Sequence, residues 1–422
     1  MSAEPGSLPS FRVAPEGLFS FLADPDIRSL TDAFEARRAD SFRFVGGCVR
    51  NPLIDLPASD LDAATLFPPE TTIEIIKEAG WKPIPTGIDH GTVTAVKDGR
   101  PVEITTVRAD VETDGRHAIV RFGTDWTTDW RRRDFTMNAL YLTPAGDVYD
   151  PASGAEDAKA RRVRFIGDPD ARISEDYLRI LRFYRFSAWY AAEIDAAGDE
   201  ACARGAGGLA DLSAERVRME LLKLLAAPQP THAARAMSAA GVLQARFGVG
   251  GDIASFERLV RLTETVTAAG RPVVRLAALI SAADARFADG LRLSNLEKAE
   301  LLAAQASAAT LTDLAELSDP EIRAARYRLG AEGFAAGGAL AWARSGADTS
   351  DERWRRALRR GLDWTPLEFS LSGDDVKRAG VAPGPAVGRV LRAVEGDWIE
   401  ADFPDDPAFI QARLTARAAE EA

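Results

Sequence analysis

The stretch 42–66, FRFVGGCVRNPLIDLPASDLDAATL, contains two short apolar runs separated by a glycine pair and an acidic pair. Residues 42–45 and 61–66 are bounded by Gly, Pro or Asp, which predicts two strands. Gly46 and Gly47 follow the first strand directly, and such a turn lets the backbone approach a bulky anion. A glycine pair after a strand also occurs in ordinary turns. The pair therefore predicts either a phosphate site, with Arg50 forking onto the phosphate, or a structural turn.

Strand signals continue outward from this stretch and stop before residue 165. Short apolar or β-branched runs occur at 93–96, 102–107 and 139–142, and a helical pattern covers 69–79. These segments predict a mixed α/β head.

After about residue 165 the sequence consists of long Ala/Leu/Arg-rich segments with helical spacing. The patterns predict one helix over 174–190 and another over 213–226, the second opened by a Ser213 cap. The expected fold class is α+β, an α/β head followed by all-helical parts. The expected division is an N-terminal arm (1–25), a head (26–165), a neck (166–228), a body (229–365) and a tail (366–422).

The composition restricts the class of protein. The chain has 422 residues and a net charge of −12, the wrong sign for a protein that coats nucleic acid non-specifically. Residues 131–185 nevertheless hold eleven Arg/Lys against nine Asp/Glu, so positive charge is concentrated there. Two cysteines and three histidines exclude a disulfide framework and a Cys/His zinc site. Without a membrane-spanning run or a signal-peptide pattern, the expected location is cytoplasmic.

An Asp-x-Asp pair opens the second strand of the head. Side chains two apart on a strand share a face, so Asp60 and Asp62 would project together. Mg²⁺ suits such a pair because it takes carboxylates, phosphates and water as ligands. Glu103, in an otherwise apolar strand, could complete the site. The alternatives are an exposed acidic strand end and an edge position for Glu103.

A second polar cluster precedes the run at 139–142. Arg132, Arg133, Asp134 and Asn138 lie within seven residues, which suggests contacts to a ribose and a triphosphate. The alternative is a surface ion pair between Arg133 and Asp134, worth well under about 1 kcal/mol.

Six motifs occur in an order that resembles the class II tRNA nucleotidyltransferase and bacterial poly(A) polymerase family. The resemblance runs through residues 42–225. The motifs are Gly46-Gly47-Cys48-Val49-Arg50, Asp60-Leu61-Asp62, His90-Gly91-Thr92, VEITTVR at 102–108, RRDFTMNA at 132–139, and EDYLRILRFYRF at 175–186.

The resemblance implies a polymerase β-like nucleotidyltransferase head that works with two Mg²⁺ ions. Asp60 and Asp62 would hold the metal, with Glu103 as an assisting carboxylate. The implied nucleotide contacts are Gly46, Gly47 and Arg50 at the triphosphate, and Arg133, Asp134 and Asn138 near the ribose. Asn51 stands where the family usually has Asp, and we expect it still to cap the following turn.

The neck motif suggests how a base is chosen without a template. Asp176 and Arg179, three apart on the expected helix, would offer an acceptor beside a donor, and Arg182 and Arg185 would continue the stripe. Cytosine and adenine present an amine beside a bare ring nitrogen and fit this pair, whereas guanine and uracil are repelled. The alternative is an ordinary i, i+3 ion pair.

The family alone leaves CCA addition and poly(A) addition open. The glycine-punctuated segment 372–391 resembles the tail of CCA-adding enzymes, and the loop 109–129, which the family uses in switching from C to A, has full length. We therefore expect tRNA, CTP and ATP as partners. Restricted A or CC addition, a silent RNA-binding protein and a small-molecule nucleotidyltransferase are the remaining alternatives.

Overall fold

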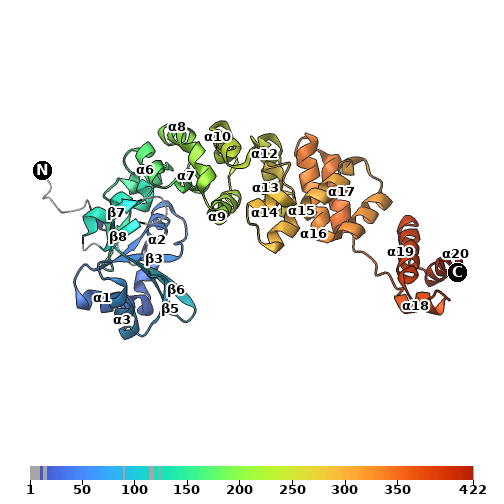
Figure 1. The fold of residues 1–422 in the computed structure, drawn as a ribbon, viewed down its shortest axis with the longest axis horizontal. Helices are drawn as coiled ribbons and strands as arrows, with labels where there is room; N and C mark the ends of the chain where they lie inside the picture. Colours follow the sequence, from blue (N-terminus) through green and yellow to red (C-terminus); the bar gives the residue numbers. More distant parts are fainter. Residues whose placement is uncertain (1–9, 13–16, 89–90, 114–117, 123–124, 422) are drawn as a thin grey trace. The chain divides into compact units, whose positions relative to one another are not determined.

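The computed structural model describes residues 10–12, 17–88, 91–113, 118–122 and 125–421. The chain divides into two compact units, residues 1–250 and 251–422. In Figure 1 the first unit, blue to green, combines a sheet with helices. The second unit, yellow to red, has helices and no strand among its described residues (Figure 1). The expected α+β fold class is confirmed.

The head is built on one mixed sheet that contains the strands expected from the sequence. Its order among the described residues is β1-β10-β9-β2-β3-β6-β5-β4. The central pair, β3 and β6, is parallel, with Asp62 beside Glu103 in register. The strands are β1 (Ser10–Arg12), β2 (Phe42–Val45), β3 (Leu61–Thr65), β4 (Lys82–Gly87), β5 (Thr92–Lys97), β6 (Arg100–Thr106), β9 (Tyr141–Leu142) and β10 (Asp147–Tyr149).

Two helices, α1 (Pro25–Arg37) and α3 (Pro69–Glu78), cover one face of this sheet (Figure 1). Phe34 and Ile75 pack there against Ala63 of β3 in one apolar core. Because side chains alternate along a strand, Ala63 on this face leaves Asp62 on the opposite face. The carboxylates therefore project away from the core.

Part of the segment expected as an N-terminal arm belongs to the head. β1 pairs with β10, and the side chains of Phe19 and Leu22 are buried in the head core. The expectation of a separate arm is wrong for these residues. Burying the apolar side chains of Phe19 and Leu22 removes them from water, and this favours their packing into the head. Residues 1–9 and 13–16 lie outside the described residues.

Two segments of the head differ from the sequence-based expectation. The expected loop 109–129 contains a hairpin of β7 (Arg108–Thr113) and β8 (Ala118–Phe122), followed by α4 (Trp126–Asp129). The expected strand 139–142 is reduced to β9, because Thr136–Asn138 forms a 3-10 turn. Residue 90 of the His90-Gly91-Thr92 motif, and residues 114–117 and 123–124 of the loop, lie outside the described residues.

The helix expected over 174–190 is wrong, because the chain breaks at Asp176. α6 (Pro169–Glu175) ends there and α7 (Leu178–Tyr190) begins two residues later. Asp176 is extended, with φ −157° and ψ 105°, and its carboxylate accepts the Leu178 amide hydrogen at 3.0 Å. A local side-chain bond of this kind competes with helix continuation. The expected helix with a Ser213 cap is confirmed as α9 (Ala214–Leu225).

The other helices of the first unit are α2 (Gly47–Arg50) and α5 (Gly154–Lys159) in the head, α8 (Ala196–Gly205) in the neck, and α10 (Thr231–Ala239) and α11 (Val242–Phe247) after the neck.

The second unit holds most of the helical array expected after residue 229, but it begins at residue 251, because α10 and α11 belong to the first unit. Gly330, with φ +70°, bends α16 inside its length. Val376, Trp398 and Leu414 form a separate tail core, against which Tyr327 of α16 packs. Its helices are α12 (Ile253–Arg261), α13 (Pro272–Leu279), α14 (Ala285–Gly290), α15 (Asn295–Thr310), α16 (Asp319–Ser345), α17 (Glu352–Asp363), α18 (Gly373–Arg378), α19 (Pro385–Glu400) and α20 (Pro407–Glu421). None of the helices in the described parts of the chain has both the length and the apolar character needed to cross a bilayer.

Candidate active site

A cleft of about 720 Å³ in the first unit brings together almost all of the residues expected from the sequence. Glu103 is the exception and lines an adjoining cavity of about 300 Å³. Asp62 and Arg133 line both cavities, so the two spaces adjoin at these side chains. The expected residues on the cleft are Gly46, Gly47, Arg50, Asp60, Asp62, Arg133, Asp134, Asn138, Asp176, Arg179, Arg182 and Arg185.

The carboxylates cluster at the start of β3. Asp60 immediately precedes the strand, and Asp62 stands beside Glu103 across the parallel pair. Burial raises the pKa of Asp62 to about 6, and the negative charges of Glu103 and Asp60 add to the rise. Like charges held this close favour a cation between them. Among the described residues, however, no three Asp, Glu, His or Cys side chains form a complete metal-ligand set, so Glu103 does not complete a site with both aspartates.

The glycine turn brings the backbone close to the loop before β3. Gly46 has φ +72°, a conformation that side chains other than glycine rarely adopt. A Cβ on Gly47 would lie 2.3 Å from Ser59 Oγ, so a larger residue would force the Ser59 side chain to move. The Gly46 amide hydrogen is not free for an anion, because it bonds to the Leu140 carbonyl at 3.2 Å.

Arg50 is buried at the base of the cleft and already bonded. Its Nε and Nη2 donate to Asn51 Oδ1 at 3.1 and 2.8 Å, and Nη1 donates to Asn138 Oδ1 at 2.5 Å. The guanidinium also lies 4.0 Å from the centre of the Tyr190 ring. The expectation that Asn51 caps the next turn is wrong, because its side chain holds Arg50 and donates to the Pro57 carbonyl.

The suggested surface ion pair between Arg133 and Asp134 does not form. Arg133 pairs instead with Asp129 at 3.0 Å and donates to the Tyr141 hydroxyl. Asp129 is fully buried and also pairs with Arg132 at 2.5 Å. Despite the cost of burial, these two arginines lower the pKa of Asp129 to about 2. Asp129 thus fixes both arginine side chains at the edge of the cleft.

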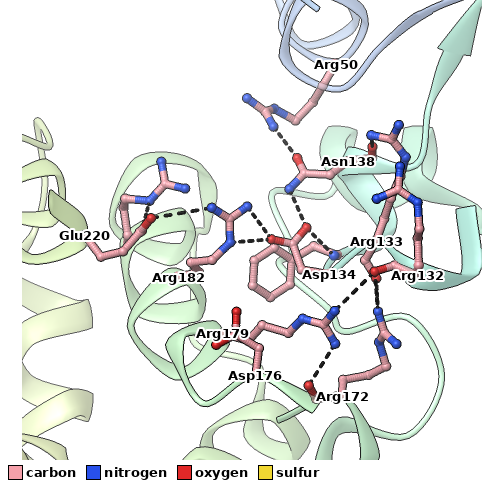
Figure 2. Close-up of polar contacts among 12 residues, drawn as sticks. Arg50, Arg132, Arg133, Asp134, Asn138, Arg172, Asp176, Arg179, Arg182 and Glu220 are labelled. Atoms are coloured by element: carbon pink, nitrogen blue, oxygen red, sulfur yellow. Dashed lines mark hydrogen bonds and ion pairs between the residues drawn. The ribbon is translucent and has the colours of Figure 1, made fainter. Parts of the chain in front are cut away.

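Asp134 links the head to the neck. Its Oδ2 accepts from Arg182 Nη2 at 2.6 Å, and its Oδ1 accepts from Asn138 Nδ2 at 2.9 Å (Figure 2). Against the cost of burial, Arg182 and Asn138 lower the pKa of Asp134 to about 2. Asn138 uses both ends of its amide, one on Asp134 and the other on Arg50 (Figure 2). Asp134 and Asn138 therefore line the cleft and also connect Arg50 of the head to Arg182 of the neck.

Asp176 and Arg179 both reach the cleft, but they are not the i, i+3 ion pair of the alternative interpretation. Asp176 pairs with Arg216 of α9 at 2.6 Å, and Arg179 pairs with Glu175 at 2.5 Å. The break before α7 separates the two side chains and lets each be held by a different partner. Arg216 also lines the cleft.

Glu220 is a buried acid that the sequence analysis missed. From α9 it pairs with Arg185 at 2.5 Å and lies 3.5 Å from Arg182 Nη1 (Figure 2). The signal was present, since Glu220 falls on the same helical stripe as the buried Val217 and Leu224. Asp129 was likewise detectable, four residues before Arg133.

The cleft carries an excess of positive charge in a chain that is acidic overall. Eight cationic side chains line it against four aspartates. The cations are Arg50, Arg132, Arg133, Arg179, Arg182, Arg185, Arg216 and Lys223, and the acids are Asp60, Asp62, Asp134 and Asp176. A concave, cationic site with a carboxylate cluster on one wall suits a polyphosphate together with a metal ion.

Two family models match the first unit. Residues 42–164 match the model described as "Poly A polymerase head domain", and residues 193–247 match "Probable RNA and SrmB- binding site of polymerase A".

Curated relatives match most of the chain. "CCA tRNA nucleotidyltransferase 1, mitochondrial" of Mus musculus is 32% identical over 91% of this chain and 88% of its own length. "CCA-adding enzyme" of Limosilactobacillus fermentum is 30% identical over 86% of this chain and 90% of its own. Among solved structures, the Bacillus stearothermophilus CCA-adding enzyme in complex with CTP has a TM-score of 0.73 and 27% identity. That match covers 94% of this chain and 98% of the Bacillus chain.

The mixed-sheet head, the carboxylates at the start of its central strand and the cationic cleft define a nucleotidyltransferase. The extent and identity of the curated matches make the assignment more specific. The chain belongs to the CCA tRNA nucleotidyltransferase family.

Proposed function

We propose that this chain adds C, C and A to the 3′ end of tRNA, taking the nucleotides from CTP and ATP. The observation that carries the proposal is the sharing of one cleft by the carboxylates Asp60 and Asp62 and the neck residues Asp176 and Arg179. A small-molecule nucleotidyltransferase needs the first pair but not the second. A silent RNA-binding protein needs neither.

Asp60 and Asp62 are the residues that would hold Mg²⁺, and Glu103, beside Asp62 on β6, would assist by adding negative charge without ligating the metal. The raised pKa of Asp62, caused by burial and by two neighbouring carboxylates, fits a site built for a cation. Two protein ligands also suit Mg²⁺, which takes its remaining ligands from phosphate and water. Bound there, Mg²⁺ would ease deprotonation of the RNA 3′-hydroxyl and neutralise charge on the departing pyrophosphate.

The chain's own residues would bind and orient the reactants. Arg132 and Arg133, both fixed by Asp129, would face the triphosphate, which for Arg133 replaces the ribose contact expected from the sequence, and the Gly46–Gly47 turn would leave room for it. The 3′-hydroxyl oxygen forms the new bond to the α-phosphorus, and the bond to the pyrophosphate oxygen breaks in line with it. Catalysis of this kind comes mostly from positioning and from charge already in place.

Base choice would come from Asp176 and Arg179. A carboxylate oxygen keeps a free lone pair while bonded to Arg216 or to an amide, so Asp176 can accept from the exocyclic amine of C or A. Arg179 would donate to the adjacent ring nitrogen. Uracil and guanine would set a carbonyl against the acid and an N–H against the guanidinium, which costs affinity.

The direct experiment offers the purified chain a tRNA that lacks its 3′ CCA, with Mg²⁺ and each nucleotide alone or together. We expect two additions from CTP alone and three from CTP plus ATP, resolved on a sequencing gel. Long tails from ATP alone would instead identify a poly(A) polymerase, and no addition under any condition would contradict the proposal.

We also propose a cytoplasmic location. Cys48 and Cys202 are free and buried, as thiols are in a reducing compartment. The mouse relative is named as mitochondrial, so the location needs its own test. A tagged chain that co-purifies with organelles after fractionation would contradict the proposal.

A further inference from the structure

Arg172 holds the head against the neck at the level of the nucleotide cleft. It lies on α6, is 8% exposed, and donates from Nη2 to the carbonyl oxygens of Arg132 and Arg133 at 2.6 and 2.7 Å (Figure 2). These carbonyls stand at the end of the 3-10 turn Trp130–Arg132, where no helical partner is available. One side chain of the neck thus donates to two backbone carbonyls in the segment that carries Arg132 and Arg133, the arginines proposed to face the triphosphate.

The same residue holds the neck arginine that would select the base. Nη1 of Arg172 donates to both carboxylate oxygens of Glu175 at 2.7 and 2.5 Å, and that carboxylate also pairs with Arg179 at 2.5 Å. The Arg172 carbonyl accepts from Arg179 Nη1 at 2.8 Å. Arg179 Nη2 in turn lies 3.2 Å from the Arg132 carbonyl. Arg172 therefore contacts, directly or through one carboxylate, both ends of the space that a nucleotide would fill.

The contacts of Arg172 can fix the distance between the head and neck segments as well as hold them together. Both Nη atoms of the Arg172 guanidinium are engaged, Nη2 on two carbonyl oxygens of the head and Nη1 on one carboxylate of the neck. A planar fork with fixed donor angles sets a distance, whereas a lysine ammonium on a flexible stem does not. The side chains of Arg132 and Arg133 are positioned separately, by Asp129, so they do not depend on Arg172 for their direction.

We propose that Arg172 is a positioning residue for nucleotide selection. It sets the distance between the segment at Arg132 and Arg133, which faces the triphosphate, and Arg179, which faces the base. A nucleotide bound through its triphosphate then presents its base at the right distance for Arg179 to distinguish C from U. The inference rests on the proposed function and deepens it. Arg172 itself is absent from the residues that line the cleft, so it acts through its neighbours.

The test compares binding of a whole nucleotide with binding of its triphosphate part. Calorimetry on the full chain in Mg²⁺ buffer would use CTP, UTP and inorganic tripolyphosphate as three separate probes. For Arg172→Lys we expect tripolyphosphate affinity to stay within about twofold, because Asp129 still orients both arginines. We expect the CTP-over-UTP affinity ratio to fall by up to about a hundredfold, the size of the effect that a misplacement of about 1 Å can have on a rate. The ratio of kcat/KM for CTP over UTP should fall with it.

Arg204→Lys is the matched control, because Arg204 also fastens α6, through an exposed ion pair with Asp170 at 2.7 Å. It should change neither ratio. Arg172→Gln is the second variant, which keeps a donor but loses the charge, and thermal unfolding of each variant checks the fold.

An unchanged CTP-over-UTP ratio in Arg172→Lys would overturn the inference. So would an equal loss of CTP and tripolyphosphate binding, which indicates general collapse of the cleft, or the failure of both Arg172 variants to fold. A wild-type chain that does not prefer CTP over UTP would contradict the proposed function itself, and with it this inference. A selective wild type with an equally selective variant would contradict the inference alone.

Discussion

Asp62 occupies the point where the two cavities of the head meet, and its carboxylate lies among other negative charges. A charge held in this position is unfavourable in the apo protein and becomes favourable only beside a cation. Function and stability therefore make opposite demands on this residue, as is common where groups are arranged for chemistry.

Asp62→Asn should abolish nucleotide addition and stabilise the apo fold. We expect activity to fall by about a thousandfold or more, as when a metal ligand is lost, and the unfolding midpoint without Mg²⁺ to rise because a like-charge repulsion disappears. Single-turnover addition and thermal unfolding in EDTA measure the two effects. Asp98→Asn, at an exposed turn of the same sheet, is the control and should leave both unchanged. Near-normal addition by Asp62→Asn would remove the metal assignment.

Asp134 makes the opposite contribution, since its pKa is lowered to about 2 in the folded chain. A lowered folded pKa gives stability that is fully present above the unfolded value of about 3.9 and is lost as the pH falls through about 2. The stability gap between wild type and Asp134→Asn should therefore be largest above about pH 4, at roughly 2 kcal/mol, and should shrink toward pH 2.

Urea unfolding of both chains between pH 2 and pH 6 measures this gap. Glu74→Gln, on the exposed face of α3, controls for a general loss of negative charge. A gap that is constant with pH would contradict the buried ion pair between Asp134 and Arg182.

At the scale of elements, the break between α6 and α7 is what allows Asp176 and Arg179 to face the cleft with different partners. Tyr177, inside the break, packs its ring against Gly208 of the 3-10 helix Ala206–Asp211. A Cβ on Gly208 would lie 2.3 Å from that ring, whereas a Cβ on Gly207 would meet nothing within 4 Å.

These neighbouring glycines provide a matched pair of substitutions. Gly208→Ala should displace Tyr177 and cost about 1–3 kcal/mol of stability, with a weaker preference for CTP over UTP. Gly207→Ala should be neutral or slightly stabilising, because it only reduces the freedom of the unfolded chain. Thermal unfolding measures the stability of each variant, and nucleotide competition measures its preference for CTP over UTP. Equal stability and equal preference in the two variants would show that the packing of Tyr177 on Gly208 does not stabilise the break between α6 and α7.

The sequence was informative about elements whose pattern is local. The strands at 42–45 and 61–66 follow from short apolar runs with Gly and Asp boundaries, and the α9 cap follows from Ser213 alone. The break at Asp176 could not be seen, because an i, i+3 Asp–Arg spacing fits an unbroken helix equally well. The packing of Tyr177 on Gly208, which accompanies the break, is a contact between distant positions.

The order of the motifs predicted which residues form the site, but it did not predict the hydrogen bonds and ion pairs among them. Each expected residue was named as a ligand contact, yet Asp134, Asn138 and Arg50 are bonded mainly to one another and to the neck. Asp176 pairs with Arg216, which lies 40 positions away in the chain, and no local spacing in the sequence predicts such a pair. Asp129 and Glu220 lie outside the six motifs, so the order of the motifs does not include them.

At the scale of the whole molecule, an acidic chain presents a cationic cleft to a polyanionic substrate. A net charge of −12 disfavours non-specific binding to nucleic acid, whereas the eight cations that line the cleft would attract a nucleotide to one place. The described part of the second unit has helices and no strand, and it includes a separate core in the tail. The chemistry and the base choice that we propose both belong to the first unit.

We propose that Asp176 and Arg179 select C and A without a template, in the same cleft as Asp60 and Asp62, the carboxylates that would hold the metal. The most direct test offers tRNA lacking its CCA to wild type and to Asp176→Ala with all four nucleotides in competition, and sequences the products. The wild type should give ends that read CCA. The variant should give mixed ends or very low yield, while thermal unfolding shows an intact fold. Uniform CCA ends from Asp176→Ala, at near wild-type yield, would contradict the account.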